Sequence, residues 1–260
     1  MRILIAPAKQ MRADPDSPAP ETVPRFQAEA GELLERLREL DDGELQRLWK
    51  VSDTLAAENI RRVRTMDLTR GLTPALFAYD GIQYKYLGPG ALEDRALAWV
   101  NRHLRIGSGF YGLLRPTDGI VPYRLEMQAR LRVGPYRDLY AYWGNRLALA
   151  LAEETDLVLD LASREYSRAV TDPLPPTVRV LRFEFLSRRA DGTLAEKATL
   201  CKMARGQMVR YLAEAGTADR TVLEAFDGIR WEYAPALSGP DRLVYVERSA
   251  RPGVRPAFEW

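Results

Sequence analysis

The string LRIGSGFYGLLRPTDGIVPYRLEM spans residues 104–127 and contains four glycines and two prolines. These residues interrupt regular structure, so we expect the segment to follow an irregular course. It also carries a high density of charged and hydroxyl side chains, which is typical of functional loops. The alternative is an ordinary connection between strands whose arginines are solvated. The choice between the two depends on what the rest of the chain places around this segment.

Residues 104–106 are predicted to form a buried strand, and the glycines of GSGFYG (107–112) have the spacing of a dinucleotide-binding turn. That turn requires a helix that begins inside the motif. Pro116 follows four residues after the last glycine, where it would break such a helix. The spacing therefore does not predict a dinucleotide site. It favours a glycine-rich turn whose amides, together with Arg105 and Arg115, hold an anion.

The composition predicts a globular protein. Its 260 residues are 46% apolar and 28% charged, enough for one large domain or two closely packed ones, and we expect a single domain over 1–260.

Cys201 and His103 are the only cysteine and histidine, which excludes a disulfide framework and the usual zinc sites. We therefore expect no metal and no cofactor, and any metal would have to sit on carboxylates. The first apolar run, residues 3–6, is too short for a signal peptide, and no run suits a membrane span, so we expect a cytoplasmic protein that does not bind membranes.

Charge is unevenly distributed although the net charge is only +2. Residues 14–58 carry 12 acids and 5 bases, residues 95–137 carry 8 bases and 2 acids, and residues 179–211 carry 8 bases and 3 acids. Two basic segments that line one surface would bind phosphate or nucleic acid. Equally, segments of opposite sign can neutralise one another in the fold.

Apolar periodicity predicts that the chain contains both strands and helices. We expect strands at 2–6, 104–106 and 156–161, a hairpin of 178–186 with 194–200 around Asp191-Gly192, and late strands near Trp231 and 243–246. We expect helices at 25–40, within 90–103 and 136–154, from Cys201 onward, and near 221–226.

Residues 44–66 resemble a helix-hairpin-helix element, in which hairpin amides bind a DNA phosphate. Ser52 and Asp53 interrupt an apolar helical pattern as a helix N-cap would, which predicts two short helices joined by a tight turn. Lys50 and Ser52 stand where the hairpin usually has glycines. Lys50, the Ser52 amide, Arg61 and Arg62 could contact phosphates, or the pair could be an ordinary helical hairpin with a solvated basic end.

The central segment also supports an enzyme as an alternative. Phosphate binding uses arginines and amides but has no need of the carboxylates, phenols and serine of the same segment. In an enzyme acting on a nucleobase or nucleotide, by N-glycosidic or group-transfer chemistry, Glu126 or Asp118 would be the general acid or base. Arg105 or Arg124 would hold an anion. The catalytic candidates under this alternative are Glu126, Asp118, Tyr111 and Ser108, with Tyr123 orienting the substrate. The same side chains could instead form a buried ion pair and part of the core.

Several segments together resemble one family, the YaaA peroxide-stress proteins. They follow the family's order along nearly the whole chain, and they are ILIAPAK (3–9), FAYDGIQY (77–84), SGFYGLLRPTDGIVPYRLEM (108–127), LYAYWG (139–144), LASREY (161–166) and KMARG (202–206). The sequence departs from the family at Gln10-Met11 and at Gly107, where a leucine is usual.

The resemblance implies a cytosolic α+β protein, a single compact domain with a mixed central sheet flanked by helices. It implies in addition a protein that binds duplex or distorted DNA, without strong sequence preference, in a positive cleft. It also implies a protein that limits iron-mediated oxidative damage in peroxide-stressed bacteria. The resemblance thus predicts DNA as the main partner, with a nucleobase or nucleotide as a further ligand under the enzyme alternative. The candidate phosphate contacts are Lys9, Lys50, Ser52, Arg61, Arg62, Arg105, Arg115, Arg124, Lys202 and Arg205.

Overall fold

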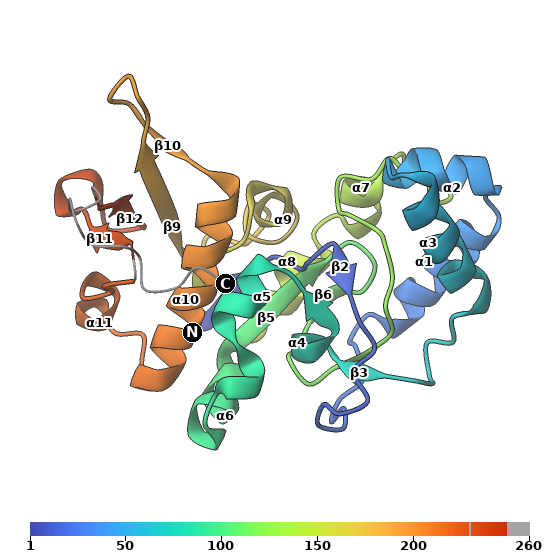
Figure 1. The fold of residues 1–260 in the computed structure, drawn as a ribbon, viewed down its shortest axis with the longest axis horizontal. Helices are drawn as coiled ribbons and strands as arrows, with labels where there is room; N and C mark the ends of the chain where they lie inside the picture. The colour runs from blue at the N-terminus through green and yellow to red at the C-terminus, as the bar shows by residue number, and fades with distance from the viewer. Residues whose placement is uncertain (229, 249–260) are drawn as a thin grey trace.

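A mixed sheet forms the centre of the structure, a computed structural model that describes residues 1–228 and 230–248. Its strands lie in the order β11-β12-β9-β8-β1-β5-β6, and β10 pairs with the C-terminal end of β9, residues 186–188 (Figure 1). Their bounds are β1 Arg2–Ile5, β5 Leu104–Ser108, β6 Gly112–Leu114, β8 Leu157–Asp160, β9 Arg179–Arg188, β10 Leu194–Glu196, β11 Trp231–Tyr233 and β12 Arg242–Glu247. The predicted α+β class with a mixed central sheet is confirmed.

Strand β1 lies in the middle of the sheet and runs parallel to both neighbours. Ile5 is opposite Ile106 of β5, and Leu4 is opposite Asp160 of β8. The chain therefore leaves β1 for a strand on one side and later returns to the other side. In sheets of this kind, ligands bind beyond the carboxyl ends of the strands at such a switch point. A ligand site is therefore expected at the loops that follow β1 and β8.

The helices form two groups (Figure 1). On the sheet, α10 packs against α5, α6 and β9, while α9 packs on β5. At the far end of the molecule from β11, α1, α2 and α3 gather with α7 (Figure 1). The bounds are α1 Gln27–Arg38, α2 Asp42–Trp49, α3 Asp53–Thr65, α4 Ala75–Ala78, α5 Ile82–Leu87, α6 Asp94–His103, α7 Leu139–Trp143, α8 Arg146–Ala152, α9 Arg164–Val170, α10 Ala198–Ala215 and α11 Arg220–Glu224.

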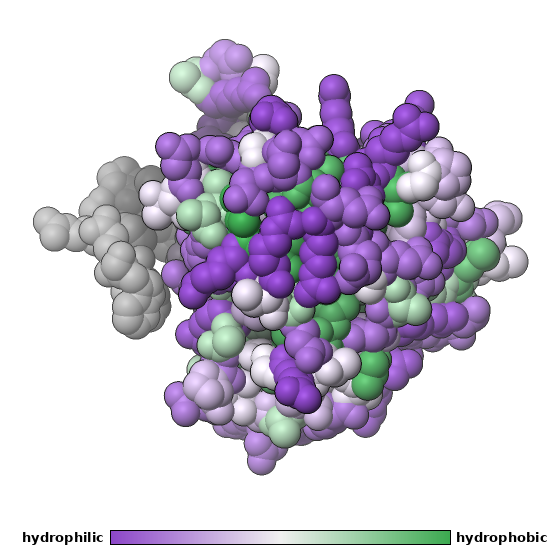
Figure 2. Space-filling view, turned by 90° about the vertical axis from the view of Figure 1, so that its right-hand side faces the viewer, coloured by the Kyte–Doolittle hydropathy of each residue, from purple (hydrophilic) through white to green (hydrophobic). Residues whose placement is uncertain are grey.

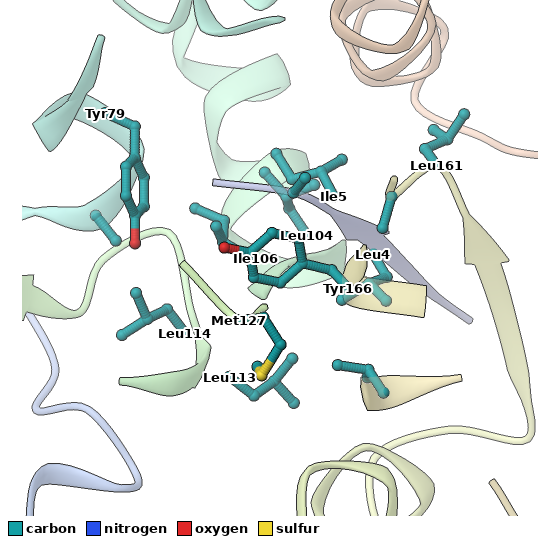
Figure 3. Close-up of a cluster of buried hydrophobic side chains, with 14 of the residues drawn as sticks. Leu4, Ile5, Tyr79, Leu104, Ile106, Leu113, Leu114, Met127, Leu161 and Tyr166 are labelled. Atoms are coloured by element: carbon teal, nitrogen blue, oxygen red, sulfur yellow. The ribbon is translucent and has the colours of Figure 1, made fainter. Parts of the chain in front are cut away.

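Two short strand pairs lie outside the main sheet. β2 (Gln10–Met11) pairs with β4 (Tyr79–Asp80), and β3 (Thr73–Pro74) pairs with β7 (Gly119–Ile120). The second pair, β3 with β7, ties the central segment to the rest of the fold. The segment 104–127 thereby becomes part of the core rather than a surface loop. Figure 3 shows Leu4, Ile5, Leu104, Ile106 and Met127 in one apolar cluster, with the ring of Tyr166 among them.

Two predicted elements have different bounds in the structure. The helix expected over 136–154 is divided into α7 and α8 at Gly144, whose φ of 52° and ψ of −123° are closed to other residues. The hairpin around Asp191-Gly192 is confirmed, with Gly192 at φ 84°. Its second strand ends at Glu196, because α10 already begins at Ala198. The rejection of a dinucleotide turn also holds, since the glycine string leads into β6 and not into a helix.

Candidate nucleic-acid interface and adjoining cavity

Buried and accessible side chains alternate along residues 123–133, on both sides of a turn at residues 127–128. Leu125, Met127 and Leu131 are buried in the core. The residues between them are accessible from the opposite side. That side carries Arg124, Glu126, Gln128, Arg130 and Arg132. The expected placement of Arg124 and Glu126 on one face is confirmed, and the two side chains form an ion pair at 3.2 Å.

A trough of about 710 Å³ lies between this stretch and the helices α1 and α2. Seven bases line it against two acids, Glu44 and Glu126; the bases are Lys9, Arg36, Arg47, Lys50, Arg124, Arg130 and Arg132. Among the described residues, Arg47, Lys50, Arg130 and Arg132 have no ion-pair partner, and all four side chains are exposed. Figure 2 shows that the end of the molecule around α1–α3 is covered mainly by hydrophilic side chains. Unpaired exposed bases in a concave surface produce a positive potential that attracts phosphate.

The connection between α2 and α3 borders the trough. A capping box of Asp41 and Glu44 fixes the start of α2, and Lys50 ends the helix with φ 52° and ψ 54°. Lys50 is the one non-glycine residue with positive φ in the described part of the chain. Ser52 occupies the N-cap position of α3, although its side chain makes no capping hydrogen bond. The two predicted helices and their tight turn are therefore present, with lysine in the left-handed conformation that glycine usually supplies.

Lys9 connects the end of β1 to the trough. Its Nζ lies 2.8 Å from Glu126 Oε2, so Glu126 pairs with both Lys9 and Arg124. These three side chains also line a second cavity of about 440 Å³, which begins where the trough ends. The two hollows therefore meet at this triad.

The second cavity lies at the switch point of the sheet. Its walls come from the loop after β1 (residues 6–10), the start of α5, the start of α9 and the middle of α10. Gly81 permits the close approach of the first two walls, because a Cβ there would lie 2.8 Å from Ala8 Cβ. Its polar lining includes Gln83, Glu126, Ser163, Glu165, Lys202 and Arg205, and its aromatic lining is Tyr84, Tyr123 and Tyr166.

Three carboxylates line this cavity, those of Asp80, Glu126 and Glu165. Burial raises the pKa of Glu165, and the nearby charge of Glu126 raises it further, against a hydrogen bond from the Gln128 amide. A carboxyl group with a raised pKa beside a second carboxylate is a common setting for general acid and base chemistry.

The remaining catalytic candidates of the central segment do not reach either hollow. Ser108 and Tyr111 are 0% exposed and Asp118 is 1% exposed. Ser108 Oγ accepts hydrogen bonds from the amides of Phe110 and Tyr111 and bonds the Tyr123 hydroxyl at 2.6 Å.

Asp118 accepts from the Thr22 hydroxyl and from the Arg115 amide, which closes the turn. Burial raises the pKa of Asp118 and of Tyr111. The side chains of Ser108, Tyr111 and Asp118 are buried in the core and lie at neither hollow. This corrects their prediction as catalytic groups. In the turn expected to hold an anion, the amides of Phe110 and Tyr111 are bonded to Ser108 Oγ and are not free to bind an anion.

The candidate phosphate contacts separate into groups. Lys9, Lys50 and Arg124 line the trough, and Lys202 and Arg205 line the second cavity. Arg105 is 5% exposed and pairs with Glu154, which also pairs with Arg2, so it cannot reach a phosphate. Four further candidates line neither hollow; they are Ser52, Arg61, Arg62 and Arg115.

Sequence reasoning missed several residues that line the two hollows. Arg36 and Arg47 lie in the acidic N-terminal segment, whose net charge conceals them. Arg130 and Arg132 continue the alternation that begins at Arg124, and this pattern could have identified them. Gln83 and Glu165 come from the strings FAYDGIQY and LASREY, which the family resemblance had already singled out.

Two further properties concern the described residues alone. Within 1–228 and 230–248, no three or more His, Cys, Asp or Glu side chains are grouped so that they could hold a metal ion. No helix in the same part of the chain is long and apolar enough to cross a bilayer.

Comparisons with known proteins agree with the resemblance in the sequence. The family described as "Peroxide stress protein YaaA" matches residues 1–237. A UPF0246 protein of Lactiplantibacillus plantarum is 45% identical over 246 residues, which cover 95% of this chain and 99% of that protein. A UPF0246 protein of Lacticaseibacillus paracasei is 42% identical over 249 residues, 95% of this chain and all of that protein. One from Desulfitobacterium hafniense is 41% identical over 250 residues, 96% of this chain and 99% of that protein. Because the family match extends over most of its length, this chain belongs to the YaaA family of peroxide stress proteins.

Proposed function

We propose that the protein binds duplex or distorted DNA in the trough, without strong sequence preference, and thereby limits iron-mediated oxidative damage during peroxide stress. One observation carries the proposal. Arg47, Lys50, Arg130 and Arg132 line one hollow, all are exposed, and none has an ion-pair partner in the described part of the chain. Neutralising such bases with phosphates releases counterions from DNA, which is the main source of affinity that does not depend on sequence.

The arrangement of the trough fits a nucleic-acid backbone better than a compact anion. Its bases come from α1, α2, the α2–α3 connection and the stretch 124–132, so several separate elements contribute them. Trp49 adds an indole Nε1 that is buried without a hydrogen-bond partner. Lys50, at the end of α2, corresponds to the position at which a helix-hairpin-helix approaches a phosphate.

The test is the salt dependence of binding to a labelled duplex. Each phosphate contact contributes about −0.9 to the slope of log affinity against log salt concentration. The double variant Arg130→Gln, Arg132→Gln should therefore bind more weakly and have a slope that is shallower by about 1.8. The matched control is Arg188→Gln, Arg189→Gln, which removes two exposed arginines near the end of β9 that line neither hollow. An affinity that does not change with salt would exclude phosphate binding in the trough.

Protection of DNA is tested separately, by strand breakage of a plasmid exposed to ferrous iron and hydrogen peroxide. At saturating protein, we expect fewer breaks with the wild type than with the Arg130→Gln, Arg132→Gln variant. Equal breakage with both proteins would separate DNA binding from any protective role.

An enzyme acting on a nucleobase or nucleotide remains a second candidate, now centred on the second cavity. The observation in its favour is that Glu126 and Glu165 face the same enclosed space. In hydrolysis of an N-glycosidic bond, water adds to the sugar carbon, the bond to the base nitrogen breaks, and the base leaves with a proton. Chromatography of nucleosides and DNA after incubation would detect the released base. Release that persists in Glu126→Gln and Glu165→Gln would exclude this pair as its source.

A further inference from the structure

We propose that the second cavity is a recognition site for a single nucleobase, and that guanine presents the edge it fits. The inference rests on the proposed DNA binding only if the base belongs to a nucleotide turned out of a DNA strand. A free nucleotide would present the same chemistry. The cavity volume of about 440 Å³ is within the range of about 300–1,000 Å³ that small-molecule sites occupy.

Arg205 provides the strongest indication of a ligand. It is 7% exposed in the middle of α10 and lines the cavity. Within the described residues, its guanidinium has one partner, Glu196 Oε1, which Nη2 reaches at 3.3 Å, and its Nε is buried with no partner. Buried donors of a charged group are costly to leave unpaired. A ligand with acceptors would complete the coordination of this group.

Arg210, further along the same helix, shows the ordinary arrangement. Its Nε lies 2.7 Å from Glu214 Oε1, one helical turn away, and it lines neither hollow. The contrast shows that the incomplete pairing of Arg205 belongs to the cavity and not to arginines on α10 in general.

The aromatic wall favours a flat ligand. The Tyr84 hydroxyl donates to the Ala6 carbonyl at 3.1 Å. The Tyr123 hydroxyl bonds Ser108 at 2.6 Å and Tyr79 at 2.8 Å. Because their hydroxyls are occupied within the protein, these rings offer apolar surface to the cavity. Rings of this kind stack on bases.

The polar wall combines donors with acceptors. Arginine pairs most often with O6 and N7 of guanine, and a carboxylate accepts from ring and exocyclic N–H groups. Arg205 would supply the donors. Within the described residues, the Glu165 carboxylate accepts one hydrogen bond, from the Gln128 amide at 3.2 Å, so it retains capacity to accept from N1–H and N2–H of guanine. Guanine carries both sets of atoms on adjoining edges.

The triad of Lys9, Arg124 and Glu126 connects this site to the trough. A phosphate held by the bases of the trough would lie near the mouth of the cavity. Its base could then enter between the aromatic rings, as in proteins that turn a nucleotide out of a duplex. The two hollows together therefore have the layout of a nucleotide site.

Calorimetric titration with guanosine monophosphate tests the proposal, with ribose 5-phosphate as the ligand that lacks a base. We expect the wild type to bind the nucleotide at least about tenfold more tightly than ribose 5-phosphate, and Arg205→Gln to lose most of that difference. Glu165→Gln should lose the difference between the two ligands as well. This second variant keeps the proposal testable if Arg205→Gln does not fold. Arg210→Gln is the matched control and should bind as the wild type does. Equal affinity for the two ligands would overturn the site, and tighter binding of another nucleotide would overturn the choice of guanine.

Duplexes with and without one unpaired guanine distinguish the two sources. Tighter binding of the duplex with the unpaired base, lost in Arg205→Gln, would identify a base from a strand. No preference between the duplexes, together with binding of guanosine monophosphate, would identify a free nucleotide. If no duplex binds at all, the trough proposal fails, while the titration with guanosine monophosphate still decides the cavity.

Discussion

Glu126 binds Lys9 and Arg124 at once, with Lys9 Nζ 2.8 Å from Oε2 and Arg124 Nη2 3.2 Å from Oε1. One carboxylate thus pairs with two of the seven bases of the trough and lowers their combined charge from +2 to +1. It does so at the point where the trough meets the second cavity. The triad limits how strongly this end of the trough attracts phosphate.

Replacing Glu126 by glutamine should therefore strengthen DNA binding. Loss of the negative charge leaves Lys9 and Arg124 available to phosphate, so we expect affinity to rise by about threefold and the salt slope to steepen by about one. Fluorescence anisotropy with a labelled duplex measures both quantities. Glu214→Gln is the control, because Glu214 pairs with Arg210 and lines neither hollow. Weaker binding by Glu126→Gln would mean that the carboxylate positions the two bases rather than neutralising them.

The stretch 104–127 illustrates what the sequence could and could not reveal. Its density of polar residues identified the segment, and the period of two placed Arg124 and Glu126 on one face. Residue type alone did not reveal that Ser108 and Asp118 are buried, because their partners lie far along the chain: Tyr123 is 15 residues from Ser108, and Thr22 is 96 residues from Asp118.

Pairing between distant segments explains most of the other differences. Glu154 lies 49 residues from Arg105, and no local pattern joins them. Strands and helices, in contrast, follow from local apolar periodicity, and most predicted elements were found within a few residues of their expected positions. The two largest deviations lie at Gly144 and Ala198, where a special backbone conformation or an early helix start depends on the tertiary structure.

Substitutions of Lys50 separate two effects at the α2–α3 connection: that of the backbone conformation on stability and that of the charge on DNA affinity. Lysine in the left-handed region is strained, whereas glycine is not, so Lys50→Gly should raise the free energy of unfolding by about 0.5 kcal/mol. The same change removes a base from the trough and should lower DNA affinity by about threefold. Lys50→Gln should reduce affinity equally without the gain in stability. Unchanged DNA affinity in both variants would remove Lys50 from the interface.

Gly206 fixes the distance between α10 and α5. A Cβ at this position would lie 2.1 Å from the carbonyl oxygen of Gln83, so one of the two helices would have to move. Gly206→Ala should therefore lower the free energy of unfolding by about 2–4 kcal/mol, measured by chemical denaturation. Gly31→Ala in α1 is the control, because a Cβ added there would have no atom within 4 Å apart from the neighbouring backbone of its own helix, and we expect it to stabilise by about 0.5–1 kcal/mol. Equal effects of the two changes would contradict the close packing of α5 on α10.

Glu154 should make stability depend on pH in the acid range. Burial acts to raise its pKa, but hydrogen bonds from Arg105 and Arg2 outweigh burial and hold the pKa below its usual value of 4.5. The unfolded chain therefore binds this proton more tightly, so the stabilisation is complete above pH 4.5 and is lost as the pH falls through the lowered folded pKa. Glu154→Gln should cost about 2–4 kcal/mol at pH 7, because Arg105 stays buried without its charged partner.

The difference in unfolding free energy between the wild type and Glu154→Gln should shrink as the pH falls below 4.5. Asp118 and Asp160 have raised pKa values because they are buried, so they contribute with the opposite sign. Both proteins contain them, and their contribution cancels in the difference. Glu153→Gln is the control, since Glu153 forms an exposed pair with Arg25 at 2.7 Å and should change stability by less than about 0.5 kcal/mol at every pH. A Glu154→Gln difference that stays constant down to the acid transition would show that the pair with Arg105 does not lower the pKa of Glu154.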